Sequence, residues 1–192
     1  MDWDWALFQF INGLAGRWPL LDGAMRFLAN DYGLTTAMSL GLVALWFEGR
    51  ERAQRERNQR AVLMAILSLL AANLLLKWCN LIYFRPRPFY AHPVHLLFYY
   101  PTDSSLPSNT AAVGFALAVS VWLWNRWAGL GFLLTALLFG WARIFCGVHY
   151  PGDVLAGALL GGGVAYLAGR WQRLLDPLLG WVIWLARRIY LA

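Results

Sequence analysis

Five stretches of the chain are apolar and almost free of charge, and this feature limits the folds that the chain can adopt. Four of them contain no charged residue, and the remaining one contains only Lys77. A membrane-spanning helix needs roughly 17–25 mainly apolar residues, so stretches of this kind predict spanning helices. They cover residues 32–47, 61–84, 104–125, 127–142 and 154–169.

The composition supports a membrane protein rather than a water-soluble one. Hydrophobic residues make up 60% of the 192 residues and charged residues only 14%, whereas a soluble domain has roughly a quarter charged residues. The 12 Trp and 8 Tyr suit a protein with two membrane–water interfaces. Cys79 and Cys146 fit neither a metal-site spacing nor a disulfide framework, so we interpret them as apolar side chains, with a single bridge as the alternative.

Three further segments complete the predicted architecture. Residues 18–30 form a weaker apolar stretch, which we interpret as part of a sixth span. Residues 1–15 and 177–192 are interpreted as short helices at the membrane interface, the latter in preference to a seventh span. The sequence therefore predicts an all-α polytopic membrane protein, in which one domain of residues 1–192 has a six-helix transmembrane bundle at about 18–172.

The basic residues predict the orientation of this bundle. Five arginines lie between residues 48 and 60, and Arg126, Arg170 and Arg173 lie at the ends of other stretches. Cytoplasmic loops carry an excess of Lys and Arg, so we place these residues and both termini in the cytoplasm. A net charge of +6 could also serve nucleic-acid binding, but its position at the ends of apolar stretches predicts no nucleic-acid partner. The opposite side then carries loops 30–33, 84–106 and 146–151.

The other polar residues gather mainly on that opposite side. Ionisable groups at membrane depth are costly and are functional candidates by default. For any one of them, contact with lipid headgroups is the alternative interpretation. The group contains all three histidines of the chain, His92, His95 and His149, together with Lys77, Asn80, Arg85, Arg87, Asp103, Ser108, Arg143 and Asp153.

One motif combines Arg143, His149 and Asp153. Pro151 suits the first position of a helix, which puts Asp153 in the first turn and within reach of His149. A carboxylate on one imidazole nitrogen fixes the tautomer and leaves the other nitrogen free as base or nucleophile. Arg143 supplies a planar fork that suits phosphate or carboxylate.

Two further motifs favour anion binding. Pro107 and Ser108 begin a predicted helix, and the N-terminus of a helix binds anions readily. In the run Arg85-Pro86-Arg87-Pro88, the prolines stop the preceding helix and fix the backbone direction, so two arginines project from a rigid turn. The three motifs together predict an oxyanion pocket with an imidazole nucleophile.

These motifs, in this order, resemble the type 2 phosphatidate phosphatase superfamily of membrane lipid phosphatases. Its pattern is Lys-x6-Arg-Pro, then Pro-Ser-Gly-His, then Ser-Arg-x5-His-x3-Asp. The third block matches at Arg143, His149 and Asp153, with Ala142 in place of the usual Ser. The first block matches at Arg87-Pro88, and the second at Pro107-Ser108. The resemblance covers roughly residues 20–170. Within it, the run RPRPFYAHPVH, with His92 and His95, and the short loop from it to LPSN are most similar to the bacitracin-resistance type of undecaprenyl-diphosphatase.

The resemblance implies a mechanism and a location. His149 attacks phosphorus and becomes phosphohistidine, and Asp153 orients it. Arg87, Ser108 and Arg143 hold the phosphoryl oxygens, and water then releases phosphate without a metal or other cofactor. The implied partner is a polyprenyl-phosphate lipid, undecaprenyl diphosphate, at the outer face of a bacterial cytoplasmic membrane.

Two departures from the family pattern bear on this mechanism. Asn80 stands where the family has Lys, and Lys77 lies one helical turn earlier on nearly the same face. Thr110 stands where the family has the His that protonates the leaving group, and His92 or His95 could replace that donor. The remaining candidate phosphate ligands are Asn80, Lys77, Arg85 and Asn109.

Thr110 leaves several functions open. The Thr is an engineered substitution, or the chain is an enzyme that works without this acid, or it is a non-hydrolytic relative that binds or transports lipid phosphates. Diphosphates expel a phosphate monoester, with a second pKa of about 6, and so need the acid less than monoesters do. A phosphatidate or phosphatidylglycerol-phosphate phosphatase and a lipid phosphotransferase are the enzyme alternatives.

Overall fold

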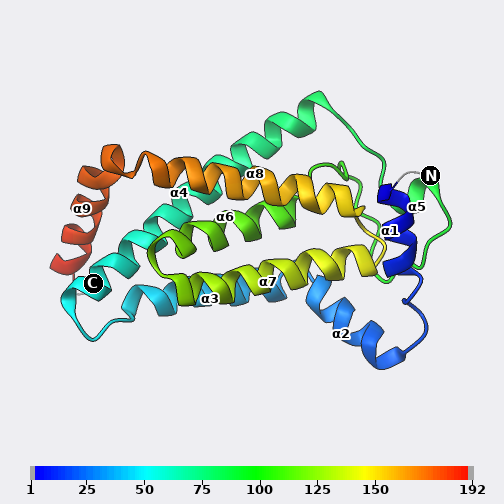
Figure 1. The fold of residues 1–192 in the computed structure, drawn as a ribbon, viewed down its shortest axis with the longest axis horizontal. Helices are drawn as coiled ribbons and strands as arrows, with labels where there is room; N and C mark the ends of the chain where they lie inside the picture. The colour runs from blue at the N-terminus through cyan, green and yellow to red at the C-terminus, as the bar shows by residue number, and fades with distance from the viewer. Residues whose placement is uncertain (1–2, 190–192) are drawn as a thin grey trace.

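The computed structural model describes residues 3–189, which form helices and loops with no strand among them. Five long helices form the body (Figure 1). They are α3 (Gly33–Phe47), α4 (Arg52–Ile82), α6 (Asn109–Trp124), α7 (Arg126–Phe145) and α8 (Pro151–Arg170). The remaining helices are α1 (Trp3–Asn12), α2 (Pro19–Ala29), α5 (Pro88–Ala91) and α9 (Gln172–Arg188). The predicted all-α class is confirmed for the described residues.

Helix α6 is the centre of the body and packs against α4, α7 and α8. Its contact with α8 is especially close, because a Cβ atom at Gly157 would lie 2.4 Å from the Ser108 carbonyl oxygen. At Gly161 a Cβ atom would lie 2.0 Å from the carbonyl oxygen of Ala112. The two glycines thus let the backbones meet, and the beginnings of α6 and α8 lie side by side, with the Ser108 N–H donating to the Asp153 carbonyl at 3.0 Å.

Three of the described helices, α4, α7 and α8, are long and apolar enough to cross a membrane. Helix α4 has 31 residues, about 46 Å of helix, so it extends beyond the roughly 30 Å of a bilayer core. Helix α6 and residues 35–47 of α3 are also apolar but shorter. The spans predicted from the sequence therefore coincide with helices, and the structure supports a multi-pass membrane protein.

A sixth span at residues 18–30 is not confirmed. Helix α2 has only 11 residues, which gives about 16 Å of helix against the roughly 30 Å of a bilayer core. It packs against α7 and α3. Figure 1 shows that α2 and α3 run one after the other toward the same end of the molecule, so the two helices together make one crossing rather than two.

This single crossing corrects the prediction that both termini share one side. We call the end with residues 83–108 and 146–150 the loop end, and the end with residues 48–60 the arginine end. Helix α1 lies at the loop end and α9 at the arginine end (Figure 1). The expectations for residues 1–2 and 190–192 fall outside the described residues.

Two details of the arginine end differ from the sequence prediction or refine it. Most of the expected loop 48–60 is helical, because α4 already begins at Arg52. Helix α9 lies across this end rather than along the body (Figure 1). Ion pairs fix it there, with Arg60 2.6 Å from Asp176 and Arg187 3.0 Å from Glu56. The interpretation of residues 177–192 as an interfacial helix rather than a seventh span stays a prediction.

The two cysteines do not form a bridge. Cys79 and Cys146 are both free, and Cys146 is buried in an apolar cluster at the loop end with Phe8, Phe145 and Tyr150. This cluster joins α1 to the beginning of α8, and it confirms the interpretation of Cys146 as an apolar side chain.

The topology predicts that single cysteines at Arg17 and Asp103 react with an impermeant reagent from one side, and a cysteine at Glu51 only from the other. Cys79 and Cys146 are replaced by Ala in the background protein. We expect labelling of positions 17 and 103 in intact cells, because cytoplasmic loops carry an excess of Lys and Arg and the arginine end is therefore predicted to face the cytoplasm. Position 51 should react only after the cells are opened. Labelling of positions 17 and 51 from the same side would contradict the single crossing by α2 and α3.

Candidate active site

His149 is a buried imidazole in the loop between α7 and α8, with 3% of its surface exposed. Its Nδ1 lies 3.0 Å from the Ser105 carbonyl oxygen, and its Nε2 lies 3.2 Å from NH1 of Arg87. A carbonyl can only accept and a guanidinium can only donate, so Nδ1 carries the proton and Nε2 presents a lone pair. Burial lowers the pKa of His149 below its ordinary 6.5 and outweighs the opposing carboxylate of Asp153. The ring is therefore neutral at neutral pH.

Asp153 lies below this ring in the first turn of α8 and is fully buried. Its Oδ2 accepts from the Tyr150 N–H at 2.9 Å and from the hydroxyl of Ser105, and it is 3.7 Å from Nδ1 of His149. Its Oδ1 accepts from NH1 of Arg85 at 2.6 Å. The carboxylate thus caps α8 and fixes Ser105, which in turn fixes the imidazole.

The two ends of the long loop 83–108 are joined at this point. The Arg85 N–H donates to the hydroxyl of Ser104 at 3.1 Å, and the Ser105 N–H donates to the Arg85 carbonyl at 2.9 Å. This pairing brings Arg85 and Ser105, which are distant in sequence, to the same carboxylate.

Arg87 projects over the other nitrogen of His149 and is 3% exposed. It donates to the Val148 carbonyl at 3.1 Å, to the Asp103 carbonyl at 3.2 Å and to the Asp103 carboxylate at 2.8 Å. Pro88 follows it as the first residue of α5, which fixes the direction of the turn. The guanidinium therefore lies between Nε2 of His149 and the exposed side chain of Asp103.

Ser108 and Thr110 stand at the beginning of α6. Ser108 is the N-cap residue, so the helix begins at Asn109, two residues later than the predicted start at Pro107. The two hydroxyls lie 3.1 Å apart, with Ser108 fully buried. Position 110 thus borders the same helix N-terminus as Ser108, although Thr110 has no ionisable proton near neutral pH.

Arg143 does not contact His149 among the described residues. Its guanidinium is buried, forms an ion pair with Asp31 and stacks on the Phe98 ring at 4.7 Å. Asp31, between α2 and α3, also accepts from the Tyr99 hydroxyl at 2.8 Å. The family resemblance assigns Arg143 and Arg87 to phosphate binding. In the structure each of them is paired with a carboxylate instead, Arg143 with Asp31 and Arg87 with Asp103.

Lys77 and Asn80 lie beside α6, away from the imidazole. With Asn109 they line a cavity of about 290 Å³ between α4 and α6. The Asn80 Oδ1 is buried there without a hydrogen-bond partner, and the Asn109 amide lies 3.5 Å from the Asp103 carboxylate. Both α4 residues thus share a cavity with Asn109, the first residue of α6.

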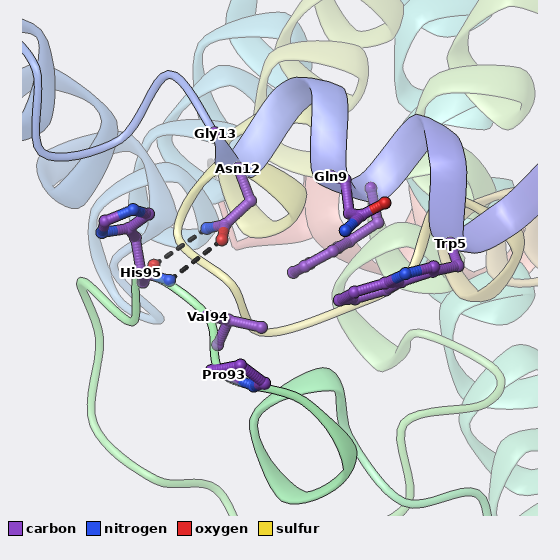
Figure 2. Close-up of a pocket in the computed structure, with 8 residues that line it drawn as sticks. Trp5, Gln9, Asn12, Gly13, Pro93, Val94 and His95 are labelled. Carbon is purple, nitrogen blue, oxygen red and sulfur yellow. Dashed lines mark hydrogen bonds between the residues drawn. The ribbon is translucent and has the colours of Figure 1, made fainter.

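His92 and His95 lie against α1 and form no contact with His149 among the described residues. The ring of His92 stacks on Trp5 with the centroids 3.9 Å apart. His95 borders a cavity of about 330 Å³, and its ring points away from the Trp5 side of that cavity (Figure 2). This placement does not support either residue as the leaving-group donor.

Sequence reasoning missed three residues of the site. Ser105 was hidden inside an apolar stretch, although two adjacent serines before a proline were a signal. Asp4 was assigned to the opposite side of the membrane, and Asp31 to a short connection. Asp4 and Asp31 have no local signal, because each meets its arginine across more than 80 residues of sequence.

Comparison with known proteins identifies the family. Residues 60–176 match the sequence model of the PAP2 superfamily. The chain belongs to this superfamily. Undecaprenyl-diphosphatase BcrC of Bacillus subtilis (strain 168) is 32% identical to this PAP2 protein over 187 residues, which cover 97% of the chain and 91% of BcrC. The family resemblance inferred from the three motifs is confirmed.

Solved structures of the same superfamily share the fold. The crystal structure of Aquifex aeolicus LpxE has a TM-score of 0.64 and 28% identity, and the match covers 85% of this PAP2 chain and 93% of LpxE. A PAP2 type phosphatidylglycerolphosphate phosphatase from Bacillus subtilis has a TM-score of 0.61 over 90% of this chain and 88% of its own. At 21% identity, that second likeness supports the fold alone. Membership places this PAP2 protein among membrane lipid phosphatases.

Because the Asp103 carboxylate is paired with Arg87, we predict that Asp103→Asn strengthens the binding of inorganic phosphate. Asp103 is half-exposed and paired at 2.8 Å, so its charge competes with an anion for the guanidinium without being needed for the core. We expect a dissociation constant about fivefold lower, roughly 1 kcal/mol, by calorimetry on purified protein in detergent. Asp22→Asn, which removes an acid bonded to the Gly16 N–H, is the matched control. Equal affinities in all three proteins would separate Arg87 from the anion site.

Proposed function

We propose that this protein hydrolyses undecaprenyl diphosphate to undecaprenyl phosphate and inorganic phosphate, with His149 as the nucleophile. The observation that carries the proposal is the buried, neutral imidazole whose Nε2 faces the guanidinium of Arg87 at 3.2 Å. Phosphoryl transfer depends largely on positioning and on stabilising charge, and this pair supplies a positioned nucleophile beside a fixed cation.

The reaction has two steps at this imidazole. In the first, Nε2 attacks the terminal phosphorus while the bond to the bridging oxygen breaks, which gives phosphohistidine and the lipid monophosphate. Arg87, Arg143 and the hydroxyl of Ser108 hold the phosphoryl oxygens, and Ser105 and Asp153 keep the Nδ1 proton in place. In the second step, water attacks the phosphohistidine and releases phosphate.

Phosphate binding by Arg87 and Arg143 is an exchange of one acceptor for another. Arg87 and Arg143 pair with Asp103 and Asp31 in the structure. An incoming phosphate takes over guanidinium donors that these carboxylates hold, because phosphate offers the same planar pair of acceptors with more charge. Lys77, Asn80 and Asn109 remain candidate ligands of the second phosphate, whereas both ends of the Arg85 guanidinium are held by the carboxylates of Asp4 and Asp153.

An apolar cavity beside the site suits a lipid chain. It has a volume of about 430 Å³ and lies between α4 and α8. Leu106 and Pro107 line it, and they immediately precede Ser108. A lipid tail in this cavity would leave its headgroup at the beginning of α6. The name of the relative BcrC supports an undecaprenyl chain, and the arginine distribution supports a site that faces the outside of a bacterial cytoplasmic membrane.

Thr110 favours a diphosphate over a monoester. A monoester expels an alkoxide, which is very basic and needs a proton, whereas a diphosphate expels a phosphate monoester with a second pKa of about 6. General acid catalysis is typically worth 10²–10⁴-fold, and most of that factor applies to the alkoxide. A site with Thr110 in place of the acid therefore retains more of its activity on diphosphates.

Thr110 also favours a second candidate function, the binding of lipid phosphates without hydrolysis. The nearest hydroxyl, that of Ser108 at 3.1 Å, cannot replace the missing acid near neutral pH. A binder of this kind would use the same arginines and the same apolar cavity. Measurements of phosphate release and of lipid binding on the same preparation distinguish the two functions.

The hydrolase proposal predicts phosphate release from undecaprenyl diphosphate at a higher rate than from phosphatidate or phosphatidylglycerol phosphate. His149→Ala should abolish release, at least a 10³-fold loss, while the melting temperature and lipid binding stay close to those of the parent. Asp153→Asn should lower the rate and leave lipid binding intact. Normal turnover by the His149→Ala protein would exclude the phosphohistidine, and binding without release by the parent would favour the second candidate.

The leaving-group argument predicts that Thr110→His restores an acid. The gain should be at least tenfold for phosphatidate, equal to about 1.4 kcal/mol of barrier, and smaller for undecaprenyl diphosphate. The pH profile should gain a falling limb at high pH as the new imidazole loses its proton. Thr110→Gln, which adds a similar volume without an acid, is the matched control. Equal gains on both lipids would overturn the argument.

A further inference from the structure

Helix α1 is fastened across the loop end at two points. At its beginning, the Asp4 carboxylate accepts from the Gly152 N–H at 2.6 Å, in the first turn of α8. At its end, the Asn12 amide donates to the carbonyls of Phe145 and His95, both at 2.8 Å. Figure 2 shows this second fastening, with Asn12 facing the backbone of His95. One short helix thus connects the end of α7 to the beginning of α8, on either side of His149.

Asp4 is an unusual residue for a helix of this kind, because its carboxylate is almost fully buried, with 5% of the residue exposed. It lies directly over Gly152, where a Cβ atom would be 2.9 Å from its Oδ2. The N-terminus of α8 carries a partial positive charge, which a carboxylate stabilises. Asp4 is therefore a cap for α8 that comes from another helix.

The second carboxylate oxygen of Asp4 accepts a hydrogen bond from Arg85, which also donates to Asp153 below His149. Arg85 donates to Asp4 at 2.8 Å through NH2 and to Asp153 at 2.6 Å through NH1. Its guanidinium also lies 4.2 Å from the centroid of the Tyr150 ring. Arg85 is thus a bridge between two buried carboxylates, one on α1 and one below His149.

We propose that Asp4 and Arg85 are positioning residues that set the charge felt by His149, with α1 supplying the carboxylate that balances Arg85. The proposal rests on the proposed function only in naming His149 as the nucleophile. Asp4, Arg85 and Asp153 together carry one net negative charge next to the ring. Without Asp4 the remaining pair is neutral, and Arg85 offsets the support that Asp153 gives to a cationic imidazole.

The charge balance predicts opposite effects for the two residues. Removal of a negative charge disfavours imidazolium, so Asp4→Asn should lower the pKa of His149. Removal of a positive charge favours imidazolium, so Arg85→Gln should raise it. The same cation is stabilised when His149 carries a phosphoryl group and both ring nitrogens are substituted, so the two residues also act on the intermediate.

Other charged groups around His149 stay in place in both variants. They come from the long loop, from α7, from α8 and from the connection between α2 and α3. They are Arg87 with its partner Asp103, Arg143 with its partner Asp31, and Asp153 itself. A difference between the two variants therefore reports the pair of Asp4 and Arg85.

The experiment is an NMR titration of the His149 imidazole in the full-length protein in detergent, without substrate. Each of the three imidazole signals is assigned by replacing one histidine at a time. We expect the titration midpoint of His149 to move to lower pH in Asp4→Asn and to higher pH in Arg85→Gln. Arg85→Lys, which keeps the charge, should restore a midpoint close to that of the parent even if Arg85→Gln folds poorly.

Asn12→Ala is the matched control for the docking of α1, because it releases the other end of the helix without a change in charge. Its titration midpoint should equal that of the parent. The proposal is overturned if Asp4→Asn leaves the midpoint unchanged, or if Asn12→Ala moves it as far in the same direction. The titration needs no turnover, so a protein that shows these shifts but releases no phosphate would refute the hydrolase function and leave the positioning role intact.

Discussion

The buried carboxylate of Asp153 is the interaction on which the rest of the loop end depends. It is fully buried, and a buried charge is tolerated only when it is paired and hydrogen-bonded. Its four partners come from two segments: Arg85 and Ser105 from opposite ends of the long loop, and His149 and the backbone N–H of Tyr150 from the connection between α7 and α8. Satisfying one acid therefore draws the long loop, the connection between α7 and α8, and α8 itself into a single arrangement, and the orientation of the imidazole follows.

The three arginines that are candidates for phosphate binding differ in the burial of the carboxylates with which they pair. Arg85 is shared between two buried acids and belongs to the support of His149. Arg87 and Arg143 each pair with an acid that is at least one-third exposed, Asp103 or Asp31. Both acids reach solvent, so each can leave its guanidinium when a phosphate takes over the same donors, as the proposed function requires. The structure thus distinguishes a supporting arginine from two arginines suited to the ligand, which the sequence run alone treats alike.

The sequence predicted what is encoded locally. The long helices follow from uncharged stretches, and His149 and Asp153 meet because they are four residues apart across a helix start. Asp4 could not be predicted, since its partner Gly152 is 148 residues away and its side of the membrane depended on whether residues 18–30 form a span. That stretch was ambiguous because its composition resembles a span, while its helix, interrupted after Ala29, is too short to make one.

The same separation between Asp4 and Gly152 has a consequence for biogenesis. Membrane helices are inserted in the order of synthesis, and α8 enters after α3, α4, α6 and α7. Asp4 must therefore wait at the loop end, with its charge in water, until α8 arrives and offers its N-terminus. A nascent chain that stops before Gly152 lacks α8 and with it Asp153, so the arrangement around His149 is completed only in chains that have synthesised nearly all of their helices.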